Sequence, residues 1–324
     1  MKTKKSKQHF DSVFQKEIYE GLTAFPKYIS SKWFYDKKGD QLFQQIMSLS
    51  EYYLTGCEYE ILDTHTAEIA QLFSDDQGFD LVELGAGDGK KTKVLLKHLV
   101  QNKIPFTYKP IDISQNALDG LEKDLMNAFP ELDMVTEQGT YFEVLENLCK
   151  RSSERKTVIM VLGSNIGNLN HENAIKFLSD IRKCMNPKDL LFMGFDQKKD
   201  PSIILNAYND SQGVTESFNK NVLKRINTIL GADFDPDCFK HWPTYDPETG
   251  TTKSFLVSTK DQKVSLNKLN LEISFSPWES IHTEISQKYD DHIVDWLAQE
   301  AGLKVTVQFQ DSKEYFTDYV FKKV

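Results

Sequence analysis

Short apolar runs alternate with longer amphipathic segments through the middle of this chain, and this alternation limits the fold more than any other feature. The runs have the length of strands, and the segments between them repeat their apolar residues with the period of a helix. Strands separated by helical segments are typical of a parallel sheet with crossover helices. We therefore predict strands at 79–84, 106–113, 132–136, 157–163 and 190–196, with helices near 90–102, 115–129, 141–151 and 172–185.

The end of the chain predicts an antiparallel hairpin. Two apolar runs, at 303–310 and 315–323, are joined by a polar link too short to carry a parallel crossover, and a predicted helix at 292–302 leads into them. Five crossover-linked strands followed by such a hairpin describe a doubly wound α/β sheet. This arrangement differs from the all-parallel sheet of dinucleotide-binding dehydrogenases.

Two parts of the chain fall outside this sheet pattern. Residues 201–231 form a long amphipathic stretch, and alternating runs follow at 253–259 and 268–275. Together with the N-terminal segment, they are long enough to form a smaller lobe. We predict one domain built from residues 57–197 and 288–324, and a substrate-binding lobe built from residues 1–56 and 198–287.

Composition excludes several classes of protein. With 39 basic and 48 acidic side chains the net charge is −9, which argues against nucleic-acid binding. No uninterrupted apolar run of 18 residues occurs, and no apolar segment follows the charged start, so we expect a cytoplasmic protein that does not bind membranes. The four cysteines are widely spaced and the histidines form no HExxH pattern, which predicts free thiols and no metal site.

A strand that runs into a glycine-rich turn predicts a ligand site. The segment VELGAGDGKKT (82–92) holds Gly85, Gly87 and Gly89, and Asp112 ends the next strand 23 residues after Gly89. Doubly wound nucleotide sites keep a carboxylate there for the ribose hydroxyls. The alternatives are a plain strand-to-helix turn, and a helix-capping role for Asp112 or Ser114. Together the two signals predict adenosine binding, and only the glycine spacing and the hairpin favour a methyl donor over a nicotinamide.

Three further segments carry polar groups suited to a small substrate. In GSNIGNL (163–169), Asn168 can donate and accept hydrogen bonds at the carboxyl edge of the sheet, although a Gly/Asn turn is the alternative. In IHTEISQKY (281–289), Glu284 and Ser286 share one face of an extended segment and suit an imidazole, unless this is a solvated edge strand. The aromatic block 32–55 is more typical of a core, but it offers the hydroxyls of Tyr35 and Tyr52.

Taken in order, these blocks resemble the histidine-specific, S-adenosylmethionine-dependent Nα-methyltransferases of ergothioneine biosynthesis. The resemblance covers nearly the whole chain, from KWFYDKKGDQLF (32–43) through AYNDSQGVT (207–215) to TEIS (283–286). It implies a class I methyltransferase (Rossmann-like) sheet with a substrate lobe, S-adenosylmethionine as methyl donor, and conversion of L-histidine to its Nα-trimethyl form, hercynine. We expect the enzyme to be a monomer.

Individual site residues follow from the same resemblance. Tyr35 and Phe43 match family residues around the methylated amine, and Tyr35, Tyr52 or water is our candidate to accept or relay its proton. The positions implied for the methyl donor are Gly85, Lys91, Asp112, Thr140 and Tyr141. The positions implied for the amino-acid substrate are Tyr52, Asn168, Tyr208, Glu284 and Ser286.

Three positions depart from the family pattern. Thr140 replaces a carboxylate expected near adenine, Asn165 replaces a threonine, and a methionine lining the imidazole pocket is replaced near Ser254. The retained Glu284 favours histidine. The change near Ser254 leaves another aromatic amino acid as an alternative substrate, and a nicotinamide-dependent oxidoreductase is the alternative enzyme class.

Overall fold

The computed structural model describes residues 9–139 and 155–324, which fall into two compact units. The large-sheet unit comprises Tyr53–Lys199 and Gln287–Val324, and the small-sheet unit comprises Met1–Tyr52 and Asp200–Ser286. The chain therefore passes between the units at three points. The predicted domain boundaries, after residues 56, 197 and 287, differ slightly from these crossings.

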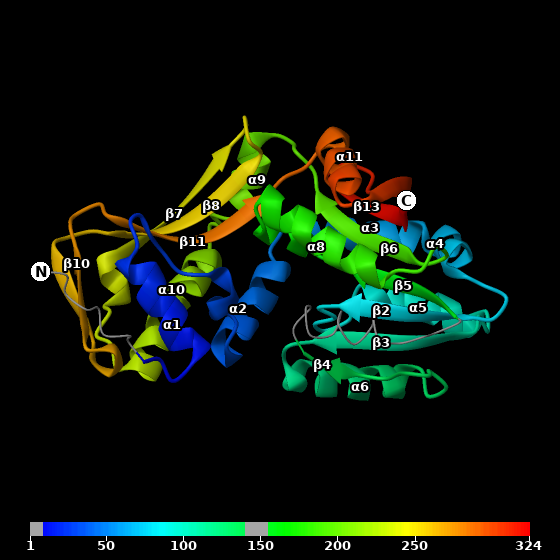
Figure 1. The fold of residues 1–324 in the computed structure, drawn as a ribbon, viewed down its shortest axis with the longest axis horizontal. Helices are drawn as coiled ribbons and strands as arrows, with labels where there is room; N and C mark the ends of the chain where they lie inside the picture. The colour runs from blue at the N-terminus through cyan, green and yellow to red at the C-terminus, as the bar shows by residue number, and fades with distance from the viewer. Residues whose placement is uncertain (1–8, 140–154) are drawn as a thin grey trace, which may run out of the picture. The chain divides into compact units, whose positions relative to one another are not determined.

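The large-sheet unit is built on a mixed sheet, in which seven strands are seen among the described residues (Figure 1). Its parallel strands include four of the five predicted apolar runs, and the predicted hairpin is present, with its second strand antiparallel to both β6 and β12. The predicted doubly wound α/β fold is thus confirmed. In sheet order the strands are β12 (Leu303–Gln310), β13 (Phe316–Lys323), β6 (Leu190–Asp196), β5 (Lys156–Val161), β2 (Phe79–Leu84), β3 (Phe106–Asp112) and β4 (Glu137–Gln138).

The strand predicted at 132–136 is wrong. Met134 makes only an isolated bridge to Tyr108, and the paired strand β4 follows at Glu137–Gln138. Val135 is half exposed, at 52%, so this short run is not the buried strand that its apolar residues suggested. The helix predicted at 141–151 lies outside the described residues.

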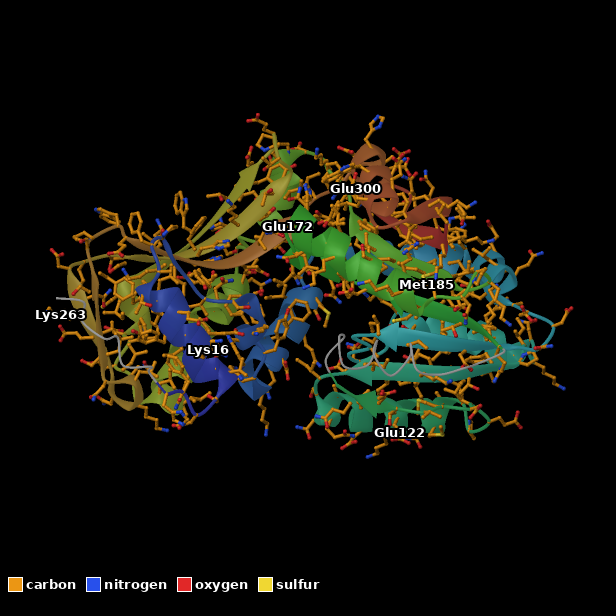
Figure 2. All side chains as sticks on the ribbon, in the orientation of Figure 1. Lys16, Glu122, Glu172, Met185, Lys263 and Glu300 are labelled. Carbon is orange, nitrogen blue, oxygen red and sulfur yellow. The ribbon has the colours of Figure 1, made fainter. Side chains whose placement is uncertain are left out.

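Helices cover both faces of the large sheet. On one face, α8 (His171–Cys184) and α11 (Asp291–Glu300) pack against alternate strand residues such as Val82, Val161 and Met193, while Glu172 and Glu300 lie on their exposed sides (Figure 2). The intervening residues, including Glu83 and Gly194, face the opposite side. There lie α3 (Tyr53–Thr64) and α5 (Thr92–Gln101), with α4 (Thr66–Phe73) beside them and α6 (Gln115–Ala128) against β3.

The small-sheet unit has its own sheet and its own core. A helix α10 (Val214–Leu230) packs its apolar face on the sheet, and α2 (Lys37–Met47) packs on α10. The predicted stretch 201–231 is thus two helices, because Asp210 accepts hydrogen bonds from the first amides of α10 and starts a new helix there. The remaining elements are α1 (Val13–Thr23), α9 (Pro201–Ala207), the sheet β1 (Lys27–Tyr28), β11 (Ser280–Gln287), β8 (Thr251–Ser258) and β7 (Phe239–Asp246), and the hairpin β9 (Gln262–Leu266) and β10 (Leu271–Phe275).

Asp196, at the end of β6, binds side chains from all three crossings between the units. Its carboxylate accepts a hydrogen bond of 2.9 Å from the Tyr53 hydroxyl and pairs with Lys199 at 2.5 Å and Lys288 at 2.7 Å. These three partners lie within two residues of the three crossings. The backbone carbonyl of Asp196 also accepts the Tyr289 amide at 2.9 Å, so the returning strand is fixed at the same place.

The cysteines only partly follow the prediction. Cys57 and Cys238 are free, but Cys184 is disulfide-bonded, so the expectation of four free thiols is wrong. Sequence spacing does not show which cysteines the fold brings together. Across residues 9–139 and 155–324, no helix combines the length and apolar character that crossing a bilayer requires.

Candidate active site

The glycine-rich turn after β2 is held against the end of β3. The amides of Gly85 and Ala86 donate to the Ile111 carbonyl at 2.8 and 3.2 Å, and all three glycines of the turn have positive φ angles. A Cβ built on Gly87 would meet no atom within 4 Å, so its φ of +55° and not crowding is what favours glycine there. The turn thus presents backbone to open space at the carboxyl edge of the sheet.

Asp112 bridges this turn and the helix that follows β3. Its Oδ2 accepts the Gly87 amide at 3.1 Å and its Oδ1 accepts the Ser114 amide at 2.9 Å. The capping alternative belongs to Ser114 instead, whose hydroxyl accepts the Ala117 amide and starts α6. Asp112 is half-buried, and a carboxylate has further lone pairs, so it can still accept hydrogen bonds from a ligand.

Lys91 lies at the start of α5, directly after the glycine-rich turn. Its ammonium pairs with Glu58 of α3, whose carboxylate also accepts the Gly163 amide at 2.8 Å. Glu58 is fully buried, whereas the Lys91 side chain is 20% exposed. Through these two contacts, Glu58 connects α3 to the start of α5 and to the loop after β5.

A second buried acid lies beneath the turn. Glu83 accepts hydrogen bonds from the Thr92 hydroxyl at 2.7 Å and the Tyr108 hydroxyl at 2.5 Å. Burial raises the pKa of Glu83 to about 7, although these two hydrogen bonds act to lower it. Its place is structural, because it ties β2 to both β3 and α5 below the surface.

The loop after β5 carries Asn168 at the end of a short 3-10 helix, Asn165–Asn168. Asn168 is exposed. Ser164, which precedes the 3-10 helix, has a left-handed backbone conformation, and its hydroxyl oxygen accepts a hydrogen bond from the Asp196 amide at 3.0 Å. Asn165 instead donates its amide to the Leu162 carbonyl at 3.0 Å, within its own loop. The loop is thus anchored to β6, with Asn168 facing solvent.

Three of the predicted substrate residues meet in the small-sheet unit. The Tyr208 hydroxyl donates to the Ser286 hydroxyl at 2.7 Å, and both residues are buried. Glu284 lies two residues earlier on the same face of β11, and its Oε2 lies 3.4 Å from the Ser254 hydroxyl. Because β11 pairs with β1 on one side and β8 on the other, the solvated edge-strand alternative is wrong.

Aromatic rings form one cluster in the same unit. Phe43 lies between Tyr35 and Tyr52, with ring centroids 5.6 and 6.2 Å away, and Phe218 of α10 lies 5.6 Å from Tyr35. All but Phe218 are partly exposed. Tyr53, which belongs to the aromatic block 32–55, donates its hydroxyl to Asp196 in the large-sheet unit.

Sequence reasoning missed several polar residues that support these groups. The Thr283 hydroxyl lies 2.9 Å from Oδ1 of Asn219 and 3.0 Å from the Ser254 carbonyl, which fixes β11 against α10 and β8. Asn219 is fully buried within a helix, and an asparagine directly after the buried Phe218 was the signal that could have found it. Glu58 had no comparable signal, since its partners are distant in sequence.

The residues at the edge of the large sheet fit the chemistry of S-adenosylmethionine. Asp112 suits ribose hydroxyls, Gly87 leaves room beside it, and Lys91 offers a cation for a carboxylate. Thr140 and Tyr141 lie outside the described residues. Within the described ranges, no group of three or more His, Cys, Asp or Glu side chains is arranged to hold a metal ion.

A glycine-rich turn, an acidic residue on the next strand and an antiparallel strand beside β6 define a class I methyltransferase fold. Residues 14–323 match the family described as histidine-specific methyltransferase, SAM-dependent. The histidine N-alpha-methyltransferase of Mycolicibacterium smegmatis is 35% identical, with 92% of this chain and 91% of that protein covered. Ergothioneine biosynthesis protein 1 of Schizosaccharomyces pombe is 30% identical over 91% of this chain, but only 39% of its own length is covered.

Among solved structures, that of the mitomycin 7-O-methyltransferase aligns with a TM-score of 0.49 and 11% sequence identity. The alignment covers 97% of this chain and 69% of the mitomycin 7-O-methyltransferase chain. The family assignment rests on the sequence matches. This chain belongs to the histidine-specific, S-adenosylmethionine-dependent methyltransferase family, and it is a methyltransferase. That membership overturns the nicotinamide-dependent alternative.

Proposed function

We propose that this enzyme transfers three methyl groups to the α-amino group of L-histidine, giving hercynine in the first step of ergothioneine biosynthesis. The observation that carries the proposal is the grouping of Tyr208, Glu284 and Ser286, which offers a carboxylate and a hydroxyl on one face of β11. A carboxylate and a hydroxyl suit the two ring nitrogens of an imidazole. The relative from M. smegmatis carries the name of the same activity.

In this proposal the two units have separate roles. The large-sheet unit binds the methyl donor through Gly85, Lys91 and Asp112, with Thr140 and Tyr141 contributing as the resemblance implies. The small-sheet unit binds the amino-acid substrate through Tyr52, Tyr208, Glu284 and Ser286. Asn168 of the large-sheet unit binds the α-amino and α-carboxylate groups of this substrate. The ligands are small molecules, and we propose a cytoplasmic monomer that binds neither nucleic acid nor membrane.

The methyl donor supplies an electrophilic methyl group on a sulfonium. The neutral amine forms a nitrogen–carbon bond as the carbon–sulfur bond breaks, so catalysis depends on holding the three atoms in line. Each round releases one proton from the amine nitrogen, and Tyr35 or Tyr52, or water, accepts or relays it. No covalent intermediate with the protein is needed.

A second candidate substrate follows from Ser254. This side chain is buried beside Glu284, and serine is smaller than the methionine of the family pattern. A larger aromatic amino acid is therefore the alternative substrate of the same reaction. It keeps the methyl donor and the α-amino acceptor unchanged.

Mass spectrometry tests both candidates directly. The purified enzyme is incubated with S-adenosylmethionine and each of the twenty amino acids in turn. We expect histidine alone to gain three methyl groups. If another aromatic amino acid is methylated in its place, the second candidate is correct, and if no amino acid gains a methyl group, the proposed function is wrong.

A further inference from the structure

Two buried acids interact with the Lys91 ammonium, one by direct contact and the other through its charge. Glu58 of α3 pairs with Lys91 and accepts the Gly163 amide at 2.8 and 2.9 Å through its two oxygens. Asp318 of β13 is also fully buried, and no N–H or O–H group of the described residues donates a hydrogen bond to either of its oxygens. The groups that act on Asp318 electrostatically are Glu58 and Lys91.

The sheet is shaped to admit these acids. Asp318 pairs in register with Gly194 of the neighbouring strand β6. A Cβ on Gly194 would lie 2.4 Å from Oε1 of Glu58 and 2.6 Å from the Phe316 ring, so any larger residue would displace the Glu58 carboxylate. The glycine thus leaves a space above the sheet that the Glu58 carboxylate fills.

Charge balance decides which acid keeps its proton. Two ionised carboxylates and one ammonium would leave a net negative charge on two fully buried acids, and such acids retain a proton instead. Glu58 is stabilised as the anion by Lys91 and the Gly163 amide. Asp318 has no such donors, and burial first, then the negative charge of Glu58, raise its pKa well above its ordinary value.

We propose that Asp318 is a neutral carboxylic acid that shares its proton with Glu58, and that the two acids together give Lys91 a single negative counter-charge. This rests on the proposed binding of the methyl donor through Lys91. With one counter-charge, the site is electrically neutral and the partly exposed ammonium can bind the carboxylate at the amino-acid end of the donor. With two negative counter-charges, the site would be negative and would repel that carboxylate. Glu58 and Asp318 are thus positioning residues for the methyl donor.

Infrared spectroscopy of the full-length protein tests the proton on Asp318 without any ligand. Wild type and the isosteric variant Asp318→Asn are compared in D₂O at neutral pH, where we expect a neutral-carboxyl band in the wild type that is absent from the variant. Asp80→Asn is the matched control. Asp80 lies near the start of β2, whereas Lys91 follows the end of that strand, and Asp80 pairs with Lys109 and Arg155. If Asp318→Asn removes no neutral-carboxyl band, the proposal is wrong.

Calorimetry then tests the role of the pair in binding. S-adenosylhomocysteine carries the amino-acid end, and 5′-methylthioadenosine lacks it, so the ratio of their affinities isolates this end and does not depend on the fraction of folded protein. We expect Glu58→Gln to raise this ratio about tenfold, because it removes the negative charge that neutralises Lys91, and a charge-assisted contact has about this size. Asp318→Asn, which stays neutral, and Asp80→Asn should both keep it.

The outcomes separate this proposal from the proposed function. An unchanged ratio in Glu58→Gln overturns the positioning role even if histidine is methylated. A raised ratio in Asp318→Asn shows that Asp318 is ionised in the wild type, and also overturns the proposal. Failure of the wild type to bind S-adenosylhomocysteine, with the infrared band present, overturns donor binding but leaves the neutral Asp318 intact.

Discussion

Lys288 and Asp196 form an ion pair in which neither side chain is exposed to solvent, with 2.7 Å between Nζ and Oδ2. Lys199 pairs with the same carboxylate and is itself only 4% exposed. Burial lowers the pKa of Lys199, although Asp196 acts to raise it. One buried carboxylate thus pairs with two buried lysines.

Replacing Asp196 should therefore be strongly destabilising. Asp196→Asn leaves two buried lysines without an anion, and breaking a buried ion pair from one side costs about 3–5 kcal/mol. Urea unfolding measures the free energy directly. Glu272→Gln serves as a control, because its pair with Lys263 is exposed on the hairpin β9–β10 (Figure 2), and it should leave stability unchanged. Equal stabilities for the two variants would contradict this account of Asp196.

Glu284→Gln should damage histidine binding and spare the methyl donor. The change removes a negative charge while keeping the shape of the side chain, and a hydrogen bond to a charged group contributes enough that KM for histidine should rise about tenfold to a hundredfold. Steady-state kinetics supply KM, and calorimetry with S-adenosylhomocysteine supplies the donor affinity. Unchanged histidine kinetics would remove Glu284 from the proposed substrate site.

The raised pKa of Glu83, about 7, makes part of the stability depend on pH. The folded state keeps a proton on this acid that the unfolded state, with its ordinary pKa near 4.5, releases, so stability is highest below pH 4.5 and falls as the pH rises through 7. The corresponding loss is about 3 kcal/mol. Urea unfolding at pH 5 and 8 should show a larger fall in the wild type than in Glu83→Gln; parallel falls would disprove the assignment.

His241 should act in the opposite direction in the small-sheet unit. Burial lowers its pKa to about 4, although Glu216 and Asp210 act to raise it. His241 therefore becomes protonated below about pH 6.5 in the unfolded chain but stays neutral in the folded state until about pH 4, so stability falls as the pH drops from 6.5 toward 4. Between pH 7 and 5 the wild type should lose about 2 kcal/mol more than His241→Gln. Tryptophan fluorescence follows this unit, since Trp33, Trp242 and Trp278 belong to it.

The glycine-rich turn and Asp112 could be located from sequence because their chemistry is local. Each stands at the end of a buried apolar run, and parallel strands bring such ends to one edge. The structure joins them through the hydrogen bond from Gly87 to Asp112. The hairpin at the C-terminus was predictable for a similar reason, since a short link allows only an antiparallel pair.

The buried charges could not be predicted. Glu58 and Asp318 stand 260 positions apart, and they meet only because α3 packs against β13 above Gly194. Lys288 follows a strand and reads as an ordinary surface lysine until the fold places Asp196 beside it. The stretch 132–136 failed for the converse reason: its apolar residues have strand-like composition, but the sheet does not bury Val135.

Tyr53, Lys199 and Lys288 all bind Asp196 within the large-sheet unit. The three points at which the chain leaves or enters this unit, after residues 52 and 199 and before residue 287, therefore lie close to one carboxylate. We therefore expect that the small-sheet unit can be exchanged for that of another family member at these three points. On the roles proposed for the two units, such an exchange would change the amino-acid acceptor and leave methyl-donor binding intact.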